Sequence, residues 1–74
     1  MRTTPFYLID ELSKKYIGFQ YIGMSSEDIE FYLTNNQDEA SGFMYEETAD
    51  LYRDKYKRIL NKESYIFEDL KKYY

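Results

Sequence analysis

The chain has 74 residues, a formal net charge of −4, ten Tyr and five Phe, and it contains neither His nor Cys. This length corresponds to a single interaction domain over residues 1–74, and a core of this size supplies only about 3–5 kcal/mol, so we expect a homodimer or a bound partner. The usual general base, the best nucleophile and the ligands of structural zinc are missing. We therefore predict a binding protein and not an enzyme, with no catalytic residues, no metal site and no cofactor.

The first half of the chain carries two helix signals separated by a segment of strand composition. Thr4 followed by Pro5 is typical of a helix start, and apolar residues at helical spacing predict a first helix that ends before Gly18. Residues 17–24 are rich in β-branched and aromatic types, which favours an extended segment or a short strand. Serines at positions 25 and 26 then precede acids and apolar residues, which predicts a short second helix as far as Asn35.

The second half of the chain indicates two further helices after a loop. Residues 37–42 are the best loop candidate. From about Met44 to Asn61 apolar residues recur at helical spacing, and Ser64 is placed to cap a last helix that extends to Tyr74. The expected fold class is therefore mainly α: a compact bundle of three to four short helices, to which one small two-stranded β pair can be added.

Charge is distributed very unevenly along the chain. No Lys or Arg occurs in the 37 residues between Lys15 and Arg53, and this stretch carries a charge of −8, against +1 for residues 1–15 and +3 for residues 53–74. We call residues 16–52 the acidic segment and expect its side chains to form the working surface. Its eight acids are Glu27, Asp28, Glu30, Asp38, Glu39, Glu46, Glu47 and Asp50.

The helix predicted from Met44 to Asn61 separates apolar from acidic residues. Steps of three and four residues place Glu46, Glu47, Asp50 and Asp54 on one side, opposite an apolar side that begins at Tyr45. One interpretation is the solvated face of an acidic protein. The other is a DNA mimic, because Lys and Arg side chains placed to bind phosphates also bind carboxylates.

The basic C-terminal third suggests a different hypothesis, a small nucleic-acid-binding module. Bases interleaved with aromatic residues are typical of such modules, and here they are Arg53, Lys55, Lys57, Arg58, Lys62, Lys71 and Lys72 with Tyr52, Tyr56, Tyr73 and Tyr74. Pairs at i, i+4 spacing, Asp54 with Arg58 and Glu68 with Lys72, reduce the charge left for phosphates. We keep this module as an alternative and expect no nucleic acid partner.

The whole chain resembles the small host-takeover proteins of bacteriophages, most closely the phage Twort type of inhibitor of the host DNA polymerase sliding clamp. The resemblance lies in chain length and in acid- and Tyr-rich character, including residues 21–28 (YIGMSSED) and 44–47 (MYEE). It implies a protein that acts in the host bacterial cytoplasm, binds the clamp and stops replication.

No apolar run approaches the roughly 20 residues of a membrane span, so no membrane partner is expected.

The expected function is inhibition of the sliding clamp, the beta subunit of DNA polymerase III, by an acidic, DNA-mimicking surface that occupies the DNA channel and blocks clamp loading. Polymerase-type partners insert a Gln-plus-apolar peptide into a clamp pocket, and residues 20–24 lack the paired Leu and Phe of that peptide, which favours the channel. We expect the eight acids to bind the partner, with Tyr21, Tyr32 and Tyr45 as anchors. Another DNA-binding host protein is the alternative target, as for an anti-restriction or anti-CRISPR DNA mimic, and a structural subunit or antitoxin is a third possibility.

Overall fold

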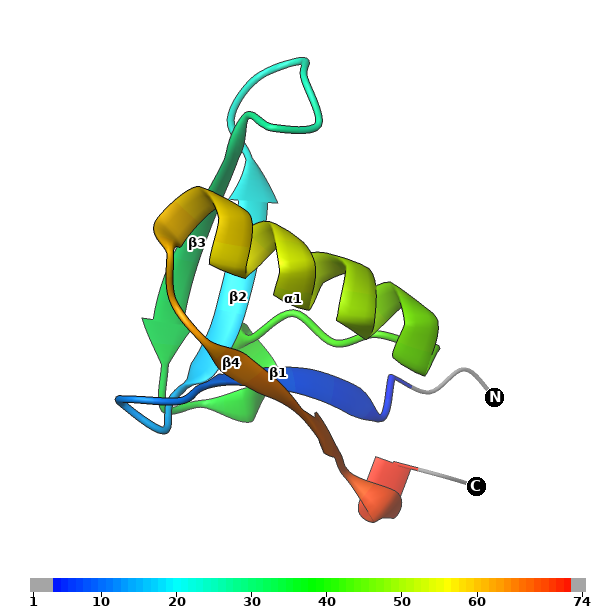
Figure 1. The fold of residues 1–74 in the computed structure, drawn as a ribbon. Coiled ribbons are helices and arrows are strands. Elements are labelled where there is room, and N and C mark those ends of the chain that lie inside the picture. Colours follow the sequence, from blue (N-terminus) through cyan, green and yellow to red (C-terminus); the bar gives the residue numbers. More distant parts are fainter. Residues whose placement is uncertain (1–3, 73–74) are drawn as a thin grey trace.

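The computed structural model describes residues 4–72, which form a four-stranded sheet crossed on one side by a single long helix (Figure 1). All neighbouring strands are antiparallel, and their order across the sheet is β3-β2-β1-β4. Strands β3 and β4 are therefore the two edges of the sheet. The elements in chain order are β1 (Phe6–Asp10), β2 (Tyr16–Tyr21), β3 (Ile29–Thr34), the 3₁₀ turn η1 (Gln37–Glu39), α1 (Glu46–Leu60), β4 (Ser64–Glu68) and the 3₁₀ turn η2 (Leu70–Lys72).

The expected mainly α bundle is wrong, because three of the four predicted helices are not helices. The predicted first helix is β1, a turn and the start of β2. β1 is a central strand in which Tyr7, Leu8, Ile9 and Asp10 are all buried. A strand buried on both faces is a nearly continuous apolar run, and such a run has no period that distinguishes it from a buried helix.

The second and fourth predicted helices are wrong for two different reasons. In β3 the residues Ile29, Phe31 and Leu33 alternate with more polar neighbours, which is the period of a strand. β4 pairs with β1 along its full length, beginning with Phe6 opposite Glu68. That partner is distant in sequence, so no local pattern reveals it. Residues 73–74, the end of the predicted last helix, lie outside the described residues.

Two expectations are confirmed. The long helix is present as α1, and the segment of strand composition includes most of β2. α1 ends at Leu60, and the next residue, Asn61, adopts the left-handed conformation with φ 55° and ψ 42° that is common after a helix. Acids in the first turn and bases in the last turn of α1 complement the helix dipole.

The sheet splays apart between β1 and β2. These strands pair beside their connecting turn, and the segment around Phe43 then enters between them. Phe43 exchanges two backbone hydrogen bonds with Phe6, at 2.8 and 3.1 Å, while Ser41 bonds to the β2 backbone through its N–H at 3.4 Å and its hydroxyl at 3.0 Å. The β2–β3 hairpin therefore turns away from β1 and β4, and its loop, residues 22–28, projects from the rest of the molecule (Figure 1).

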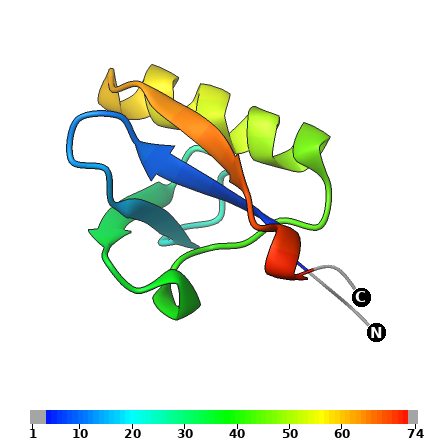
Figure 2. The same cartoon turned by 90° about the horizontal axis from the view of Figure 1, so that it is seen from below.

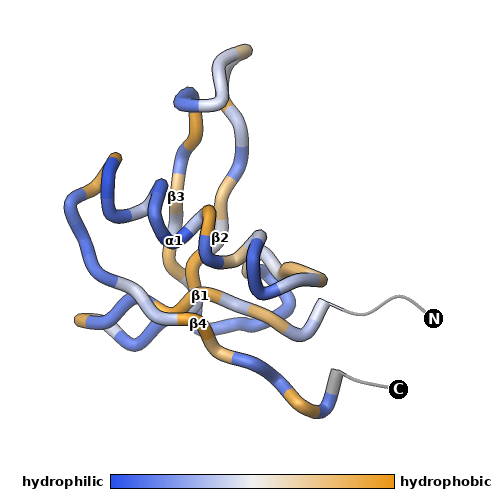
Figure 3. The backbone as a smooth tube through the Cα atoms, turned by 45° about the vertical axis from the view of Figure 1, so that its right-hand side comes forward, coloured by the Kyte–Doolittle hydropathy of each residue, from blue (hydrophilic) through white to orange (hydrophobic). Residues whose placement is uncertain are grey.

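The core lies between the sheet and α1. Figure 2 shows α1 along one side of the sheet and η1 on the opposite side, and in Figure 3 α1 alternates between hydrophilic and hydrophobic positions, as expected for a helix with one buried face. The ring of Phe19 stacks on those of Phe43 and Tyr52, with centroids 6.0 and 4.5 Å apart. The buried residues of the core are Leu8, Ile17, Phe43, Ala49 and Tyr56.

Candidate protein-binding surface

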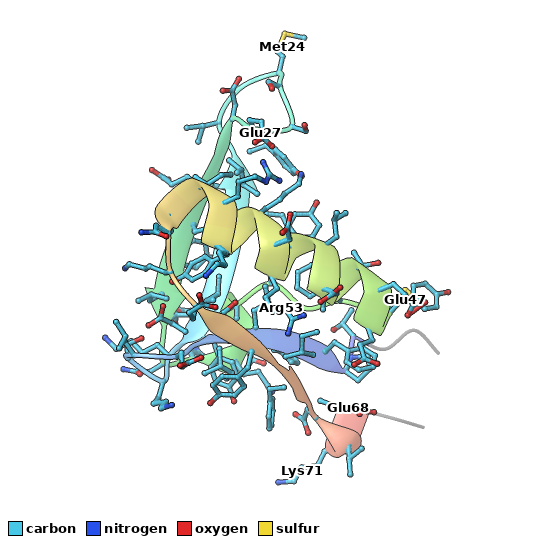
Figure 4. All side chains as sticks on the ribbon, viewed as in Figure 1. Met24, Glu27, Glu47, Arg53, Glu68 and Lys71 are labelled. Atoms are coloured by element: carbon cyan, nitrogen blue, oxygen red, sulfur yellow. The ribbon has the colours of Figure 1, made fainter. Side chains whose placement is uncertain are left out.

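The fold distributes the acidic segment over four separate places. Glu27 and Asp28 lie in the projecting loop, Glu30 lies in β3, η1 carries two acids, and α1 carries three. In Figure 4 Glu27 lies beside the projecting hairpin, whereas Glu47 lies at the far end of α1. The eight acids are exposed, but they do not form the single row that a continuous DNA mimic requires.

On α1 the acidic side is interrupted by bases. Asp50 forms an ion pair with Arg53, and Asp54 lies 3.6 Å from Arg58. The surface hollow between α1 and β4 is lined by both signs of charge. The predicted row of carboxylates is therefore confined to the first turn of α1. Its two acids there, Glu46 and Glu47, form no ion pair with any residue in the range 4–72.

A second acidic surface lies on the hairpin face that points away from α1. We call Gln20, Glu30, Tyr32, Thr34 and Glu39 the hairpin face. Its members bond to one another: Gln20 donates to Glu30 at 2.8 Å, Tyr32 donates its hydroxyl to the Glu39 carbonyl at 2.6 Å, and Thr34 donates to the Glu39 carboxylate at 2.9 Å. No base belongs to this group, so it presents two fixed carboxylates around an exposed aromatic ring.

Gly18 allows Tyr32 to lie across the strand pair. The two residues are opposite one another in β2 and β3, and a Cβ atom at position 18 would lie 2.2 Å from the Tyr32 Cζ atom. Only glycine leaves room for the ring in this position. The hydroxyl of Tyr32 is thereby held over η1, which ties the acidic turn to the hairpin.

The projecting loop has an apolar tip, which belongs to the segment compared above with a clamp-pocket peptide, residues 20–24. We call Ile22 and Met24 the hairpin tip, and these residues are 65% and 104% exposed. The side of the loop is attached to α1 by an ion pair between Glu27 and Arg58 and by a hydrogen bond of 3.4 Å from the ammonium group of Lys55 to the carbonyl of Ser26. The helix therefore holds the loop in one orientation.

The base of the loop is held by two tyrosines. The hydroxyls of Tyr21 and Tyr52 lie 2.7 Å apart, and the Lys55 ammonium lies 5.9 and 5.1 Å from their ring centroids. The hydrogen bond with Tyr21, together with burial, raises the pKa of Tyr52 to about 12. Tyr21 is thus a structural contact as well as a predicted anchor, and it remains 47% exposed.

An apolar groove, missed from the sequence, lies between β3 and the end of α1. The hollow measures about 300 Å³ and is lined by Phe31, Tyr32, Leu33, Tyr56, Leu60 and Lys62. Leu33 and Leu60 are 37% and 41% exposed. The alternation of apolar residues in β3 is the sequence signal for this groove, although the same residues also fit one side of the predicted second helix.

The predicted anchors all remain accessible. Tyr32 is 41% exposed and Tyr45 is 61% exposed. Tyr45 precedes α1 and donates no side-chain cap to it, so its ring is available to a partner beside Glu46 and Glu47. The candidate surface therefore combines exposed acids with exposed tyrosines at two places, the hairpin face and the start of α1.

The basic C-terminal third is mostly engaged within the chain. Arg53, Lys57 and Arg58 are in ion pairs, Lys55 contacts two tyrosine rings, and Tyr56 is buried. Tyr73 and Tyr74 lie outside the described residues. The described part of this third does not present the open array of bases and rings that the nucleic-acid hypothesis needs.

No group of acids within residues 4–72 is arranged to hold a metal ion, and no helix in that range is long and apolar enough to cross a membrane. The buried hydrogen bond between Tyr56 and Asp10 joins α1 to β1, and Tyr56 also lines the apolar groove. The chain matches no protein-family model, no curated protein and no solved structure.

Proposed function

We propose that this protein is a stoichiometric inhibitor that binds a basic, DNA-binding surface of another protein, and that its target is the DNA channel of the bacterial sliding clamp. One observation carries the proposal. Glu30, Glu39, Glu46 and Glu47 are exposed, and none of them forms an ion pair within the described part of the chain. The clamp as the specific target rests on the resemblance to phage inhibitors.

The arrangement suits a partner that is rich in Lys and Arg. Unpaired, solvated carboxylates attract such a surface and accelerate the encounter. Carboxylates also accept charge-assisted hydrogen bonds from bases that are placed for phosphates. Tyr32 and Tyr45 add apolar contact area with a polar tip, which is the composition that protein interfaces favour.

The mode of binding differs from a uniform imitation of a DNA strand. The acids are grouped on the hairpin face and at the start of α1, with mixed charges between them along the helix. We therefore expect two contact regions on the partner. Occupation of the channel by both regions would exclude DNA and block clamp loading.

The test is a triple charge reversal with a matched control. Glu30→Lys, Glu46→Lys and Glu47→Lys change unpaired acids of the two regions, whereas Glu11→Lys, Asp54→Lys and Glu63→Lys change exposed acids outside the acidic segment. Each reversal adds two charges, so both variants go from a net charge of −4 to +2. Binding to purified clamp is measured by calorimetry between low and physiological salt, with circular dichroism as the check on folding.

We expect the first variant to lose binding and the control to retain measurable binding, because position matters as well as net charge. Binding of the natural chain should weaken steeply as salt is raised. Equal loss in the two folded variants would overturn the assignment of these two regions. A lysate pull-down that recovers a restriction or CRISPR protein and no clamp would overturn the target, and a gel shift with DNA or RNA at physiological salt would overturn the mode of action.

A further inference from the structure

The free edge of β3 lacks the devices that usually prevent edge strands from pairing. Such edges are commonly protected by Lys, by Pro, by a bulge or by a covering segment. The sequence of β3 is Ile-Glu-Phe-Tyr-Leu-Thr, and it pairs with β2 at every position without a bulge. Its one charged residue, Glu30, belongs to the hairpin face and bonds to Gln20. The backbone of β3 is therefore free to accept another strand.

The register determines which backbone groups point outward. Ile22 donates its N–H to the carbonyl of Asp28 at 2.8 Å. In an antiparallel pair every second residue bonds to the neighbouring strand, so the residues of β3 that bond to β2 follow from Asp28 in steps of two. The bonding residues of β3 are then Glu30, Tyr32 and Thr34. Their neighbours Ile29, Phe31 and Leu33 direct N–H and C=O groups toward the free edge. The same alternation is seen in β2. There Ser41 bonds to the carbonyl of Ile17 and the N–H of Phe19, which face away from β3.

The apolar groove runs beside this edge. Leu33 and Leu60 line it and are partly exposed, and Phe31 lies beneath them against Tyr56, with ring centroids 5.1 Å apart. The opposite edge, β4, differs, because the hollows beside it are lined mainly by charged side chains from α1. Of the two edges, β3 is therefore the one at which free backbone groups lie beside an apolar surface.

We propose that the β3 edge is the dimer interface of this protein, in which β3 of a second copy pairs antiparallel with β3 of the first about a two-fold axis at Phe31. In this register Phe31 faces its own equivalent and Ile29 faces Leu33 of the second copy, so all three outward residues pair. Glu30 lies opposite Tyr32 and not opposite another acid. The two sheets become one eight-stranded sheet with both α1 helices on the same face.

Charge disfavours one alternative register of this pair. A shift that centres the pair on residue 30 places two Glu30 side chains opposite one another, which is unfavourable. The antiparallel arrangement also brings the acidic start of one β3, at Asp28, toward the end of the other β3, where Lys62 lines the groove. A two-fold contact of this kind closes on itself, as most homodimers do. The assignment is independent of the target of inhibition.

The first test is the mass of the purified chain by sedimentation, without any target. We expect a dimer whose dissociation constant rises at least about tenfold in Leu33→Lys, because a charge then enters the apolar groove beside the interface. The control is Leu51→Lys, which changes an exposed leucine of α1 and should leave the dimer intact. A monomeric natural chain at high micromolar concentration, or a dimer equally resistant to both substitutions, overturns the proposal.

The second test reads the register directly, since the chain contains no Cys. Residues 30 and 32 of opposite copies would form a non-hydrogen-bonded pair with Cα atoms about 4.5 Å apart, a distance that a disulfide spans. Oxidation of a mixture of Glu30→Cys and Tyr32→Cys chains should give a cross-linked dimer, whereas each variant alone should not. Tyr65→Cys on β4, with exposure of 40% against 41% for Tyr32, is the matched control for Tyr32→Cys. Cross-linking of Glu30→Cys to itself or to the β4 control would contradict the proposed pairing.

Discussion

The hydrogen bond between Tyr56 and Asp10 joins the second half of α1 to the central strand β1. Tyr56 donates its hydroxyl to Asp10 at 2.5 Å, and the two residues are 1% and 3% exposed. Ser13 donates two further hydrogen bonds to the other carboxylate oxygen, each of 2.9 Å. Burial raises the pKa of Asp10, but the hydrogen bonds from Tyr56 and Ser13 outweigh it and hold that pKa below the ordinary value. Burial, followed by the bond to Asp10, raises the pKa of Tyr56.

Replacing Tyr56 with Phe keeps the ring and removes this one bond. Hydrogen bonds to charged groups contribute about 1.5–3 kcal/mol, and a chain of this length has a free energy of unfolding of about 4–11 kcal/mol. We therefore expect Tyr56→Phe to lower the free energy of unfolding by about 2 kcal/mol at pH 7. The melting temperature should fall by about 8–16 °C.

The effect should depend on pH in a definite direction. The folded pKa of Asp10 is depressed, so its contribution is fully present above the unfolded value of 3.8 and is lost as pH falls below it toward the folded pKa. The difference between the natural chain and Tyr56→Phe should therefore shrink below pH 3.8, toward the roughly 1 kcal/mol of a neutral hydrogen bond.

Urea unfolding followed by circular dichroism at pH 7 and in steps below pH 4 measures both quantities. Tyr65→Phe is the control, because Tyr65 is 40% exposed and should change stability by less than about 0.5 kcal/mol. A loss in Tyr56→Phe no larger than in the control would refute the contribution of the bond. A loss that stays constant through the acid range would refute the role of the Asp10 charge.

Two further substitutions test how the candidate surface is built. Gly18→Ala should displace the Tyr32 ring and lower the free energy of unfolding by about 1–3 kcal/mol, because the new methyl group would lie 2.2 Å from Tyr32 Cζ; unchanged NMR contacts between the ring and residue 18 would contradict this. Arg58→Gln should speed amide hydrogen exchange in residues 22–28 while changing global stability by less than about 1 kcal/mol, since an exposed ion pair contributes little. Equal exchange in Arg58→Gln and the natural chain would show that the ion pair to Glu27 does not hold the loop.

The candidate surface was predictable in part. Charge distribution along the chain and the high Tyr content identified the acids and the tyrosines as the chemically unusual features, and the structure places Tyr32 and Tyr45 at the surface. It did not reveal that Asp50 and Glu27 are neutralised by Arg53 and Arg58. The partner of Glu27 comes from a distant part of the chain, and a count of bases within the acidic segment cannot include it.

The projecting loop and the apolar groove were not predicted, because each depends on the neighbours of a strand. Ile22 and Met24 are ordinary apolar residues in the sequence, and they are exposed because they lie in the loop that projects from the rest of the molecule, with Met24 at its far end (Figure 4). Leu33 and Leu60 approach one another because α1 crosses the sheet and ends beside β3. Pairwise placement of this kind requires the tertiary arrangement.

The sequence by itself determined the long helix, the strand character around β2, the lack of His and Cys chemistry and the uneven charge, since all of these are local or compositional properties. Tertiary structure alone decided that the first and last predicted helices are strands. β1 is bonded to β4 from Phe6 opposite Glu68 to Asp10 opposite Ser64, and that pairing joins a strand near the beginning of the chain to one near its end. Helical bonds form within a few residues and leave a local period, whereas the bonds that make a central strand depend on partners that no local period records.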